Sequence, residues 1–191
     1  MSPEVGTGAA VAREELSALI ESLIRDVPDF PKAGVTFKDI TPLLDDHAAF
    51  TAVVAALAAA GRSADGTVVV DKVVGMEARG FILAAPVALA LGVGFVPVRK
   101  PGKLPWTTRS MSYELEYGHE TLEMHTDALA EGERVLVIDD VLATGGTARA
   151  TAQLIEEAGA VVHGLAMMME LSFLPGREAV GDLPLTVLHT V

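Results

Sequence analysis

The chain has 191 residues, enough for one domain with a full hydrophobic core, and half of them are apolar, which suits a buried sheet. The net charge of −12 argues against the basic surface of a nucleic-acid-binding protein. There is no cysteine, which excludes disulfides and thiolate metal sites. Because the first residues also lack the basic and apolar regions of a signal peptide, we expect a cytoplasmic protein.

The first sixty residues predict two helices around an irregular segment. Residues 1–12 follow no pattern, and we expect them to be loosely ordered. Apolar residues then recur with the period of an amphipathic helix at Leu16, Leu19, Ile20, Leu23 and Ile24. The segment 26–44 contains prolines, a glycine and two phenylalanines without regular period, which indicates an ordered loop. Residues 45–60 predict an alanine-rich helix that ends at Gly61.

Strand and helix patterns alternate in the next part of the chain. Residues 67–75 predict a strand, followed by a turn that contains Arg79. The uncharged stretch 81–98 has eighteen residues, about the lower limit for a bilayer span. Its prolines and glycines divide it instead into a helix over 81–91 and a strand over 95–98, so we do not expect a membrane protein.

Positive charge is concentrated in one stretch. Residues 78–113 contain no Asp or Glu and carry +5 of a total of −12, so the rest of the chain carries −17; the five cations are Arg79, Arg99, Lys100, Lys103 and Arg109. Exposed charges are screened beyond about 8 Å at physiological salt, so this local cluster can serve an anionic ligand. The segment 99–118 breaks every periodicity and predicts a flexible loop, or lid.

The remaining elements complete an α/β pattern. Strands are predicted over 120–124, 135–138 and 161–169, a helix over 148–157, and an edge strand over 185–188. This alternation predicts an α/β fold with a mostly parallel central sheet flanked by helices, in a single domain over 1–191. The five histidines form no i, i+4 pair, so nothing indicates a zinc site.

The stretch 135–148 carries the clearest chemical signal. Asp139 and Asp140 follow a buried strand, and a small, hydroxyl-rich turn then leads into a helix N-terminus; the turn consists of Ala143, Thr144, Gly145, Gly146 and Thr147. Unpaired backbone N–H groups there favour a phosphate. Two carboxylates beside a phosphate repel it unless they bind hydroxyls or a divalent cation, so we infer a sugar phosphate with Mg²⁺ nearby. The residues alone leave an ordinary strand-to-helix connection open.

This stretch closely resembles the phosphoribosyl pyrophosphate (PRPP) signature of type I phosphoribosyltransferases. The resemblance implies their fold, with a small N-terminal hood over the base and a flexible catalytic loop. It places the 5′-phosphate on the 143–147 turn and the ribose on Asp139 and Asp140. Mg²⁺ would be held mainly by PRPP, with no direct protein ligand and at most a water-mediated contact to either aspartate.

Four other segments resemble adenine phosphoribosyltransferases. The segment 26–44 is similar to their base-covering segment, in which Phe37 would stack on adenine and the backbone of Thr36 and Lys38 would read its edge. The turn at 76–80 resembles their pyrophosphate loop, so Arg79 would bind pyrophosphate together with the lid lysines Lys100 and Lys103. Residues 112–118 resemble the end of their catalytic loop, which makes Glu116 the candidate acid or base. Residues 170–177 also match their pattern.

The resemblance implies a reaction in which adenine and PRPP give AMP and pyrophosphate, with Mg²⁺, in purine salvage. It implies a homodimer, and no nucleic-acid or membrane partner. Two alternatives remain: a phosphoribosyltransferase for another purine, such as xanthine or hypoxanthine, and a non-catalytic regulator that senses PRPP.

Overall fold

The computed structural model describes residues 5–114 and 119–191 of the chain. The chain forms two compact units, Met1–Val53 and Val54–Val191; the single domain over 1–191 stays a prediction. Helix α3 (His47–Ala59) runs across the boundary between them. The residues of the predicted PRPP signature all belong to the second unit, and the predicted base-covering segment belongs to the first.

The first unit contains three short elements that the sequence did not indicate. Strands β1 (Arg25–Val27) and β2 (Phe37–Asp39) pair antiparallel within the segment predicted as a loop, and the short helix α2 (Thr41–Asp45) follows. Helix α1 (Val5–Leu23) begins within residues 1–12, for which loose order stays a prediction. Alanine has the highest helix propensity, and the alanines of this segment favour extension of the helix.

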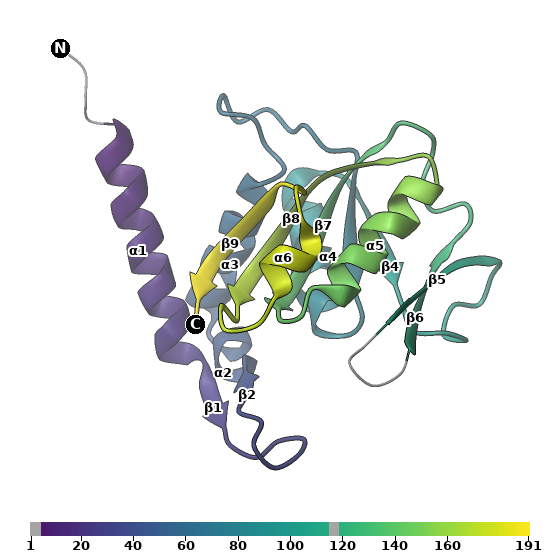
Figure 1. Ribbon diagram of the computed structural model, residues 1–191. Coiled ribbons are helices and arrows are strands. Elements are labelled where there is room, and N and C mark those ends of the chain that lie inside the picture. The colour runs from purple at the N-terminus through teal and green to yellow at the C-terminus, as the bar shows by residue number, and fades with distance from the viewer. Residues whose placement is uncertain (1–4, 115–118) are drawn as a thin grey trace. The chain divides into compact units, whose positions relative to one another are not determined.

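The second unit is built on a five-stranded parallel sheet with the order β4-β3-β7-β8-β9 (Figure 1). The strands are β3 (Lys72–Met76), β4 (Gly94–Val98), β7 (Arg134–Leu142), β8 (Val161–Glu170) and β9 (Leu185–Thr190). Most apolar residues of β3, β7 and β8 are buried, with Val161 at the amino end of β8 the exposed exception among the large apolar side chains of these strands, as expected for a parallel sheet covered on both faces. The predicted fold class is confirmed.

The strand order determines where a ligand can bind. The chain runs from β3 through α4 (Arg79–Leu91) to β4 on one side, and from β7 through α5 (Gly146–Glu157) to β8 on the other. Because such crossovers are right-handed, α4 and α5 cover opposite faces of the sheet. The crevice of an open α/β sheet forms at the strand ends where the order reverses. Here that point lies between the carboxyl ends of β3 and β7.

A hairpin follows the sheet's edge strand β4. Strands β5 (Thr108–Glu114) and β6 (His119–His125) pair antiparallel over their full length, and residues 115–118 lie outside the described part of the chain. Within the segment 99–118, predicted as a flexible loop, Thr108–Glu114 is therefore a strand, and the flexibility of the segment stays a prediction. Met111 lies opposite Leu122, and both Met111 and Tyr113 pack against the core, which explains why this segment is a strand.

The uncharged stretch 81–98 divides into α4 and β4, as predicted. In the described residues no helix is both long and apolar enough to cross a bilayer.

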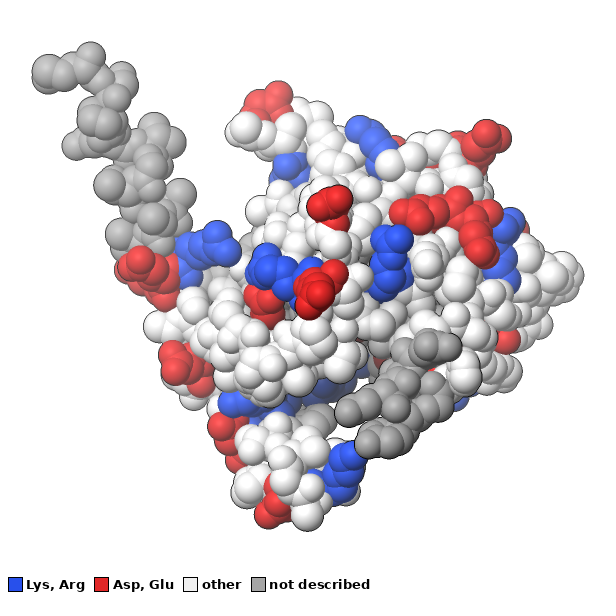
Figure 2. Space-filling model, viewed as in Figure 1, with Lys and Arg blue, Asp and Glu red and all other residues white. Residues whose placement is uncertain are grey.

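On the face drawn in Figure 2, basic side chains are interspersed with acidic ones.

Candidate functional site

The two aspartates lie inside β7, because the strand continues to Leu142 beside β8 and does not end at Ile138 as predicted. Asp139 faces the start of α4, where a Cβ at Gly80 would lie 2.5 Å from its Oδ1, so only glycine allows the helix to begin this close. The Oδ2 atom of Asp140 lies 2.7 Å from Nε of Arg79. The structure thus brings Arg79, Asp139 and Asp140 together.

Burial controls the charge of this pair. It raises the pKa of Asp139 well above its ordinary value, and the neighbouring Asp140 carboxylate raises that pKa further. Burial also raises the pKa of Asp140, although Arg79 opposes the shift. No donor in the described residues is aligned to hydrogen-bond Asp140 Oδ2, despite its ion pair with Arg79. The pair therefore has unmet capacity for ligand hydroxyls or for a cation.

The turn after β7 has the geometry of an anion site. Gly145 has φ of +81°, a conformation that favours glycine, and α5 begins at the next residue with no side chain capping its first N–H groups. A cavity of about 70 Å³ opens here, and its lining includes Asp139, Thr144, Gly145 and Thr147. Carboxylate and turn thus face the same space, as binding of a sugar phosphate requires.

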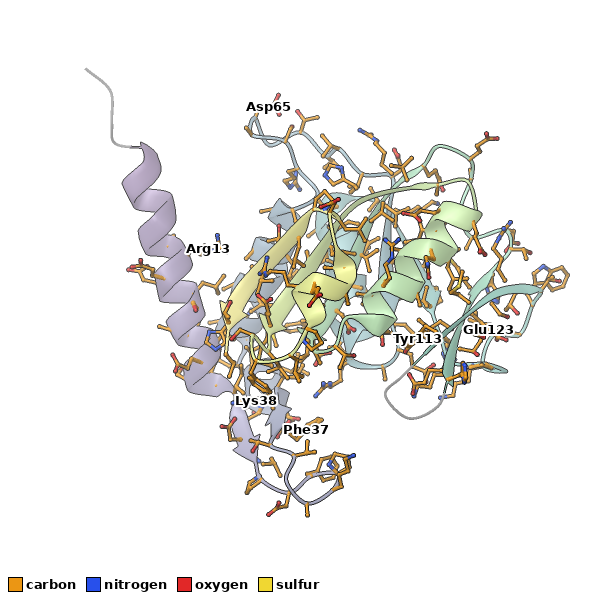
Figure 3. All side chains as sticks on the ribbon, viewed as in Figure 1. Arg13, Phe37, Lys38, Asp65, Tyr113 and Glu123 are labelled. Atoms are coloured by element: carbon orange, nitrogen blue, oxygen red, sulfur yellow. The ribbon has the colours of Figure 1, made fainter. Side chains whose placement is uncertain are left out.

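Tyr113 supports the turn from the hairpin (Figure 3). Its hydroxyl donates a hydrogen bond to Glu120 over 2.7 Å and lies 3.0 Å from Oγ1 of Thr147. Its ring lies so close to Gly146 that an added Cβ there would be 2.9 Å from it. Burial, with the Glu120 carboxylate also contributing, raises the pKa of Tyr113 to about 12, so the hydroxyl stays protonated at neutral pH.

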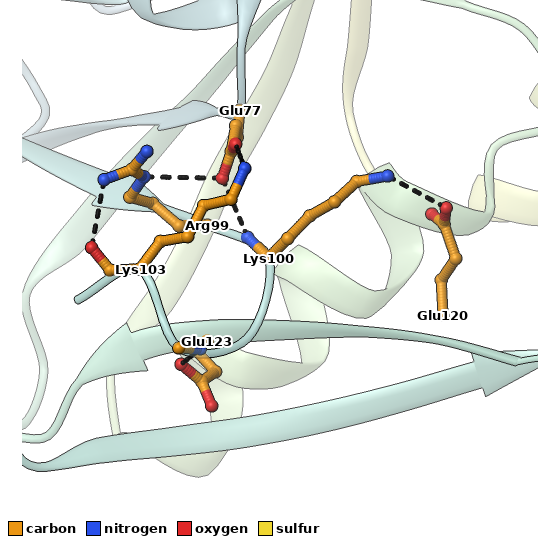
Figure 4. A network of polar contacts seen from close by, with 7 residues as sticks. Glu77, Arg99, Lys100, Lys103, Glu120 and Glu123 are labelled. Carbon is orange, nitrogen blue, oxygen red and sulfur yellow. Dashed lines mark hydrogen bonds and ion pairs between the residues drawn. The ribbon is translucent and has the colours of Figure 1, made fainter.

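The lid cations Arg99, Lys100 and Lys103 are paired with glutamates (Figure 4). Glu77, in the turn after β3, forms ion pairs with Lys103 and with Arg99, and accepts a hydrogen bond from the backbone N–H of Lys100 over 2.9 Å. The ammonium group of Lys100 lies 3.0 Å from Glu120. Burial acts to raise the pKa of Glu77, but the hydrogen bonds from Lys103 and Lys100 outweigh it and lower the pKa.

This glutamate partner was not predicted. Glu77 directly precedes the acid-free stretch and lies two residues before Arg79, which is the signal that could have identified it. Its contact with Lys103 brings that lysine to the carboxyl end of β3, beside the turn that carries Arg79.

The remaining predicted site residues lie elsewhere. Thr36, Phe37 and Lys38 belong to the first unit, in or next to β2, where the Phe37 ring packs edge-to-face on Phe30 at 5.2 Å between centroids. Glu116 lies outside the described residues. Within residues 5–114 and 119–191, no group of three or more His, Asp or Glu side chains is placed to hold a metal ion.

Comparison with known proteins agrees with this geometry. The phosphoribosyl transferase domain family matches residues 41–171, which is well over half of the chain. An adenine phosphoribosyltransferase of a Nocardioides species is 70% identical over 170 residues, covering 89% of this chain and 92% of the relative. The class of protein defined by the fold and site is therefore that of the phosphoribosyltransferases.

Similar solved structures indicate which family within this class the chain belongs to. Adenine phosphoribosyltransferase from Thermoanaerobacter pseudethanolicus matches with a TM-score of 0.85 and 49% identity, covering 91% of this chain and 99% of that one. The Saccharomyces cerevisiae enzyme, complexed with an imino-altritol bisphosphate and adenine, matches with a TM-score of 0.86 and 36% identity, covering 92% and 99%. This chain belongs to the adenine phosphoribosyltransferase family.

Proposed function

We propose that the chain transfers the 5-phosphoribosyl group from PRPP to adenine, giving AMP and pyrophosphate in purine salvage. The observation that carries the proposal is the cavity in which Asp139 and an uncapped, glycine-containing turn face the same space. Carboxylates suit sugar hydroxyls, and a helix N-terminus suits a phosphate. Close relatives that bear the name of this activity support the choice of adenine.

The ligand groups distribute over the site by charge. The 5′-phosphate binds the backbone of the turn, at Ala143, Thr144, Gly145, Gly146 and Thr147. The ribose hydroxyls bind Asp139 and Asp140. Pyrophosphate binds Arg79 and the lid lysines Lys100 and Lys103, whose glutamate partners Glu120 and Glu77 give way to it. Departure of pyrophosphate leaves positive charge on the ribose ring, so these residues act chiefly by position and electrostatics.

Mg²⁺ fits this arrangement. The carboxylates of Asp139 and Asp140 offer the oxygen ligands that Mg²⁺ prefers, and a contact through water suits two carboxylates already packed beside Arg79. When bound with PRPP, Mg²⁺ would supply positive charge that favours departure of pyrophosphate.

The base is handled by residues outside the cavity. Phe37 stacks on adenine, the backbone of Thr36 and Lys38 reads the edge of the ring, and Glu116 manages the proton of the purine. Phe37 and Lys38 belong to β2 and Thr36 directly precedes it, which is consistent with a rigid edge for recognition.

A second copy of this chain is the proposed partner, and the cytoplasm the proposed compartment. Helix α4 and the edge strand β4 expose apolar side chains, with Ile82 44%, Leu89 83% and Phe95 36% exposed. Phe95 lies on the edge strand β4, and Ile82 and Leu89 lie on α4, the helix that connects β3 to β4; a symmetric contact would cover such exposed apolar side chains.

The experiment that tests the function is turnover of adenine, guanine, hypoxanthine and xanthine with PRPP and Mg²⁺. We expect AMP and pyrophosphate from adenine, with the other bases at least a hundredfold slower in kcat/KM. Preference for hypoxanthine or xanthine would assign another purine. Binding of PRPP without turnover of any base would overturn the enzyme assignment and favour a PRPP-sensing regulator.

A further inference from the structure

An ion pair joins the end of β8 to the short helix α6 (Gly176–Val180). Arg177 donates two hydrogen bonds to Glu170, from Nε to Oε1 over 2.9 Å and from Nη2 to Oε2 over 2.5 Å. The side chain of Glu170 is only 7% exposed, whereas that of Arg177 is 60% exposed. The planar guanidinium binds both carboxylate oxygens, so the pair fixes the orientation of α6 as well as its distance from β8.

Helix α6 in turn lies directly against the backbone of the phosphate turn. A Cβ at Gly145 would be 2.6 Å from the carbonyl oxygen of Gly176 and 2.8 Å from the Cβ of Ala179. A Cβ at Gly176 would overlap the carbonyl oxygen of Ala143. Two glycines therefore permit a contact between backbones, and such a contact transmits any displacement of α6 to the turn because no flexible side chain lies between them.

The register of the sheet places the pair close to the turn. Glu170 is opposite Leu142, the last residue of β7, and the backbone N–H of Leu171 donates to the carbonyl oxygen of Leu142 over 3.0 Å. The turn begins at the next residue, Ala143. Neither Glu170 nor Arg177 lines the cavity that Asp139 and the turn share.

We infer that Glu170 and Arg177 are positioning residues for the 5′-phosphate: by holding α6 against Ala143 and Gly145, they keep the amides of the turn directed at that phosphate. The inference rests on the proposed function, because it concerns the same site. If the pair had a structural role alone, its loss would lower stability and would affect the binding of all ligands alike. A positioning role weakens only those ligands that carry the 5′-phosphate.

The test compares ligands with and without that group in the Arg177→Gln variant of the full chain. PRPP and AMP carry the 5′-phosphate, and pyrophosphate does not. We expect the KM for PRPP and the Kd for AMP to rise at least fivefold. The KM for pyrophosphate in the reverse reaction, at saturating AMP, and kcat should stay within twofold, because the lost interaction is the same in ground and transition states.

Three further variants complete the experiment. Glu170→Gln should reproduce the effect, and the double variant should lose no more affinity than the larger single loss, since both singles break one pair. Arg134→Gln is the matched control. It breaks the Asp71–Arg134 pair at the opposite end of β7 and should leave the binding of PRPP, AMP and pyrophosphate unchanged. If Arg177→Gln does not fold, Arg177→Lys, whose ammonium cannot bind both oxygens in plane, should show the same split at smaller size.

Equal changes for AMP and pyrophosphate, or no change for either, would overturn the inference. Failure of the unaltered protein to bind AMP or to use PRPP would instead overturn the proposed function.

Discussion

At the scale of single residues, the site depends on two carboxylates with different surroundings. Asp139 is enclosed beside Gly80, and Asp140 lies against Arg79. Burial raises the pKa of both groups, so ionised carboxylates are held at a cost until a ligand compensates for it. Function and stability should therefore respond in opposite directions when either aspartate becomes an amide.

Asp140→Asn should lower turnover at least tenfold, equivalent to about 1.4 kcal/mol of transition-state stabilisation. The amide cannot pair with Arg79 as a carboxylate does, and it binds ribose hydroxyls more weakly. Steady-state kinetics with adenine and PRPP give the measurement. Asp65→Asn, in an exposed loop, is the control and should keep full turnover. Turnover of Asp140→Asn within twofold of normal would show that this residue does not bind the ribose.

Asp139→Asn should raise the stability of the ligand-free protein at neutral pH. The folded-state pKa of Asp139 is raised, so the cost of ionisation is absent below the ordinary pKa of 3.8 and complete above the raised value. Asparagine removes this cost while its oxygen still accepts the hydrogen bond from the Asp140 N–H. We expect Tm to rise by a few degrees at pH 7.5, which corresponds to about 1 kcal/mol in the free energy of unfolding.

The increase in Tm should shrink as the pH is lowered toward 4. A variant that melts below the unaltered protein at pH 7.5 would contradict the assigned cost of ionisation.

The sequence was sufficient to place these aspartates shortly before a glycine-containing turn, because they are neighbours in the chain; the ligand groups assigned to them stay predictions. It was not sufficient for Glu77, whose partner Lys103 is 26 residues away. That contact depends on how the segment after β4 folds back on the β3 turn, and no local pattern encodes such a path.

At the scale of elements, the hairpin β5–β6 and the turn after β7 are supported by one another through Tyr113. The sequence did not reveal β5 because Thr108–Glu114 is largely polar, and its pairing with β6 is what defines it as a strand. The end predicted for β7 from the sequence was also too early, at Ile138 instead of Leu142. The two aspartates suggest a strand end, but the register with β8 continues to Leu142.

Two variants of the lid contact should act in opposite directions. Lys103→Ala removes a cation that binds pyrophosphate. The KM for pyrophosphate in the reverse reaction should therefore rise at least fivefold. Glu77→Gln removes the competing carboxylate while still accepting the N–H of Lys100, and the KM for pyrophosphate should fall two- to threefold. Glu123→Gln is the control. Among the contacts drawn in Figure 4, the Glu123 carboxylate accepts a hydrogen bond only from the backbone N–H of Gly102. Changes of the same sign in both variants would refute this competition.

At the scale of the whole molecule, the parallel sheet and its helices followed from the alternating pattern, because buried strands and amphipathic helices have different periods. The division into two compact units depends on contacts across the chain, which no local pattern encodes. Helix α6 was also missed, because its five residues are too few to show a period.

The exposed apolar edge of the second unit gives a prediction about assembly. Leu89→Glu should convert a dimer to a monomer in sedimentation velocity, because a charge would be buried at the centre of an apolar contact. Val161→Glu, an exposed apolar position at the amino end of β8, should leave the dimer intact. A Leu89→Glu variant that sediments as a dimer would place the interface elsewhere.

The pairing of Lys103 and Arg99 with Glu77 has a consequence for the response to ionic strength. Salt weakens attraction between these cations and pyrophosphate, but it weakens their internal pairing as well. The two effects act on opposite sides of the binding equilibrium and partly cancel. Affinity for the diphosphate should thus vary less with salt than its charge alone would dictate, which makes a highly charged reaction tolerant of changing electrolyte.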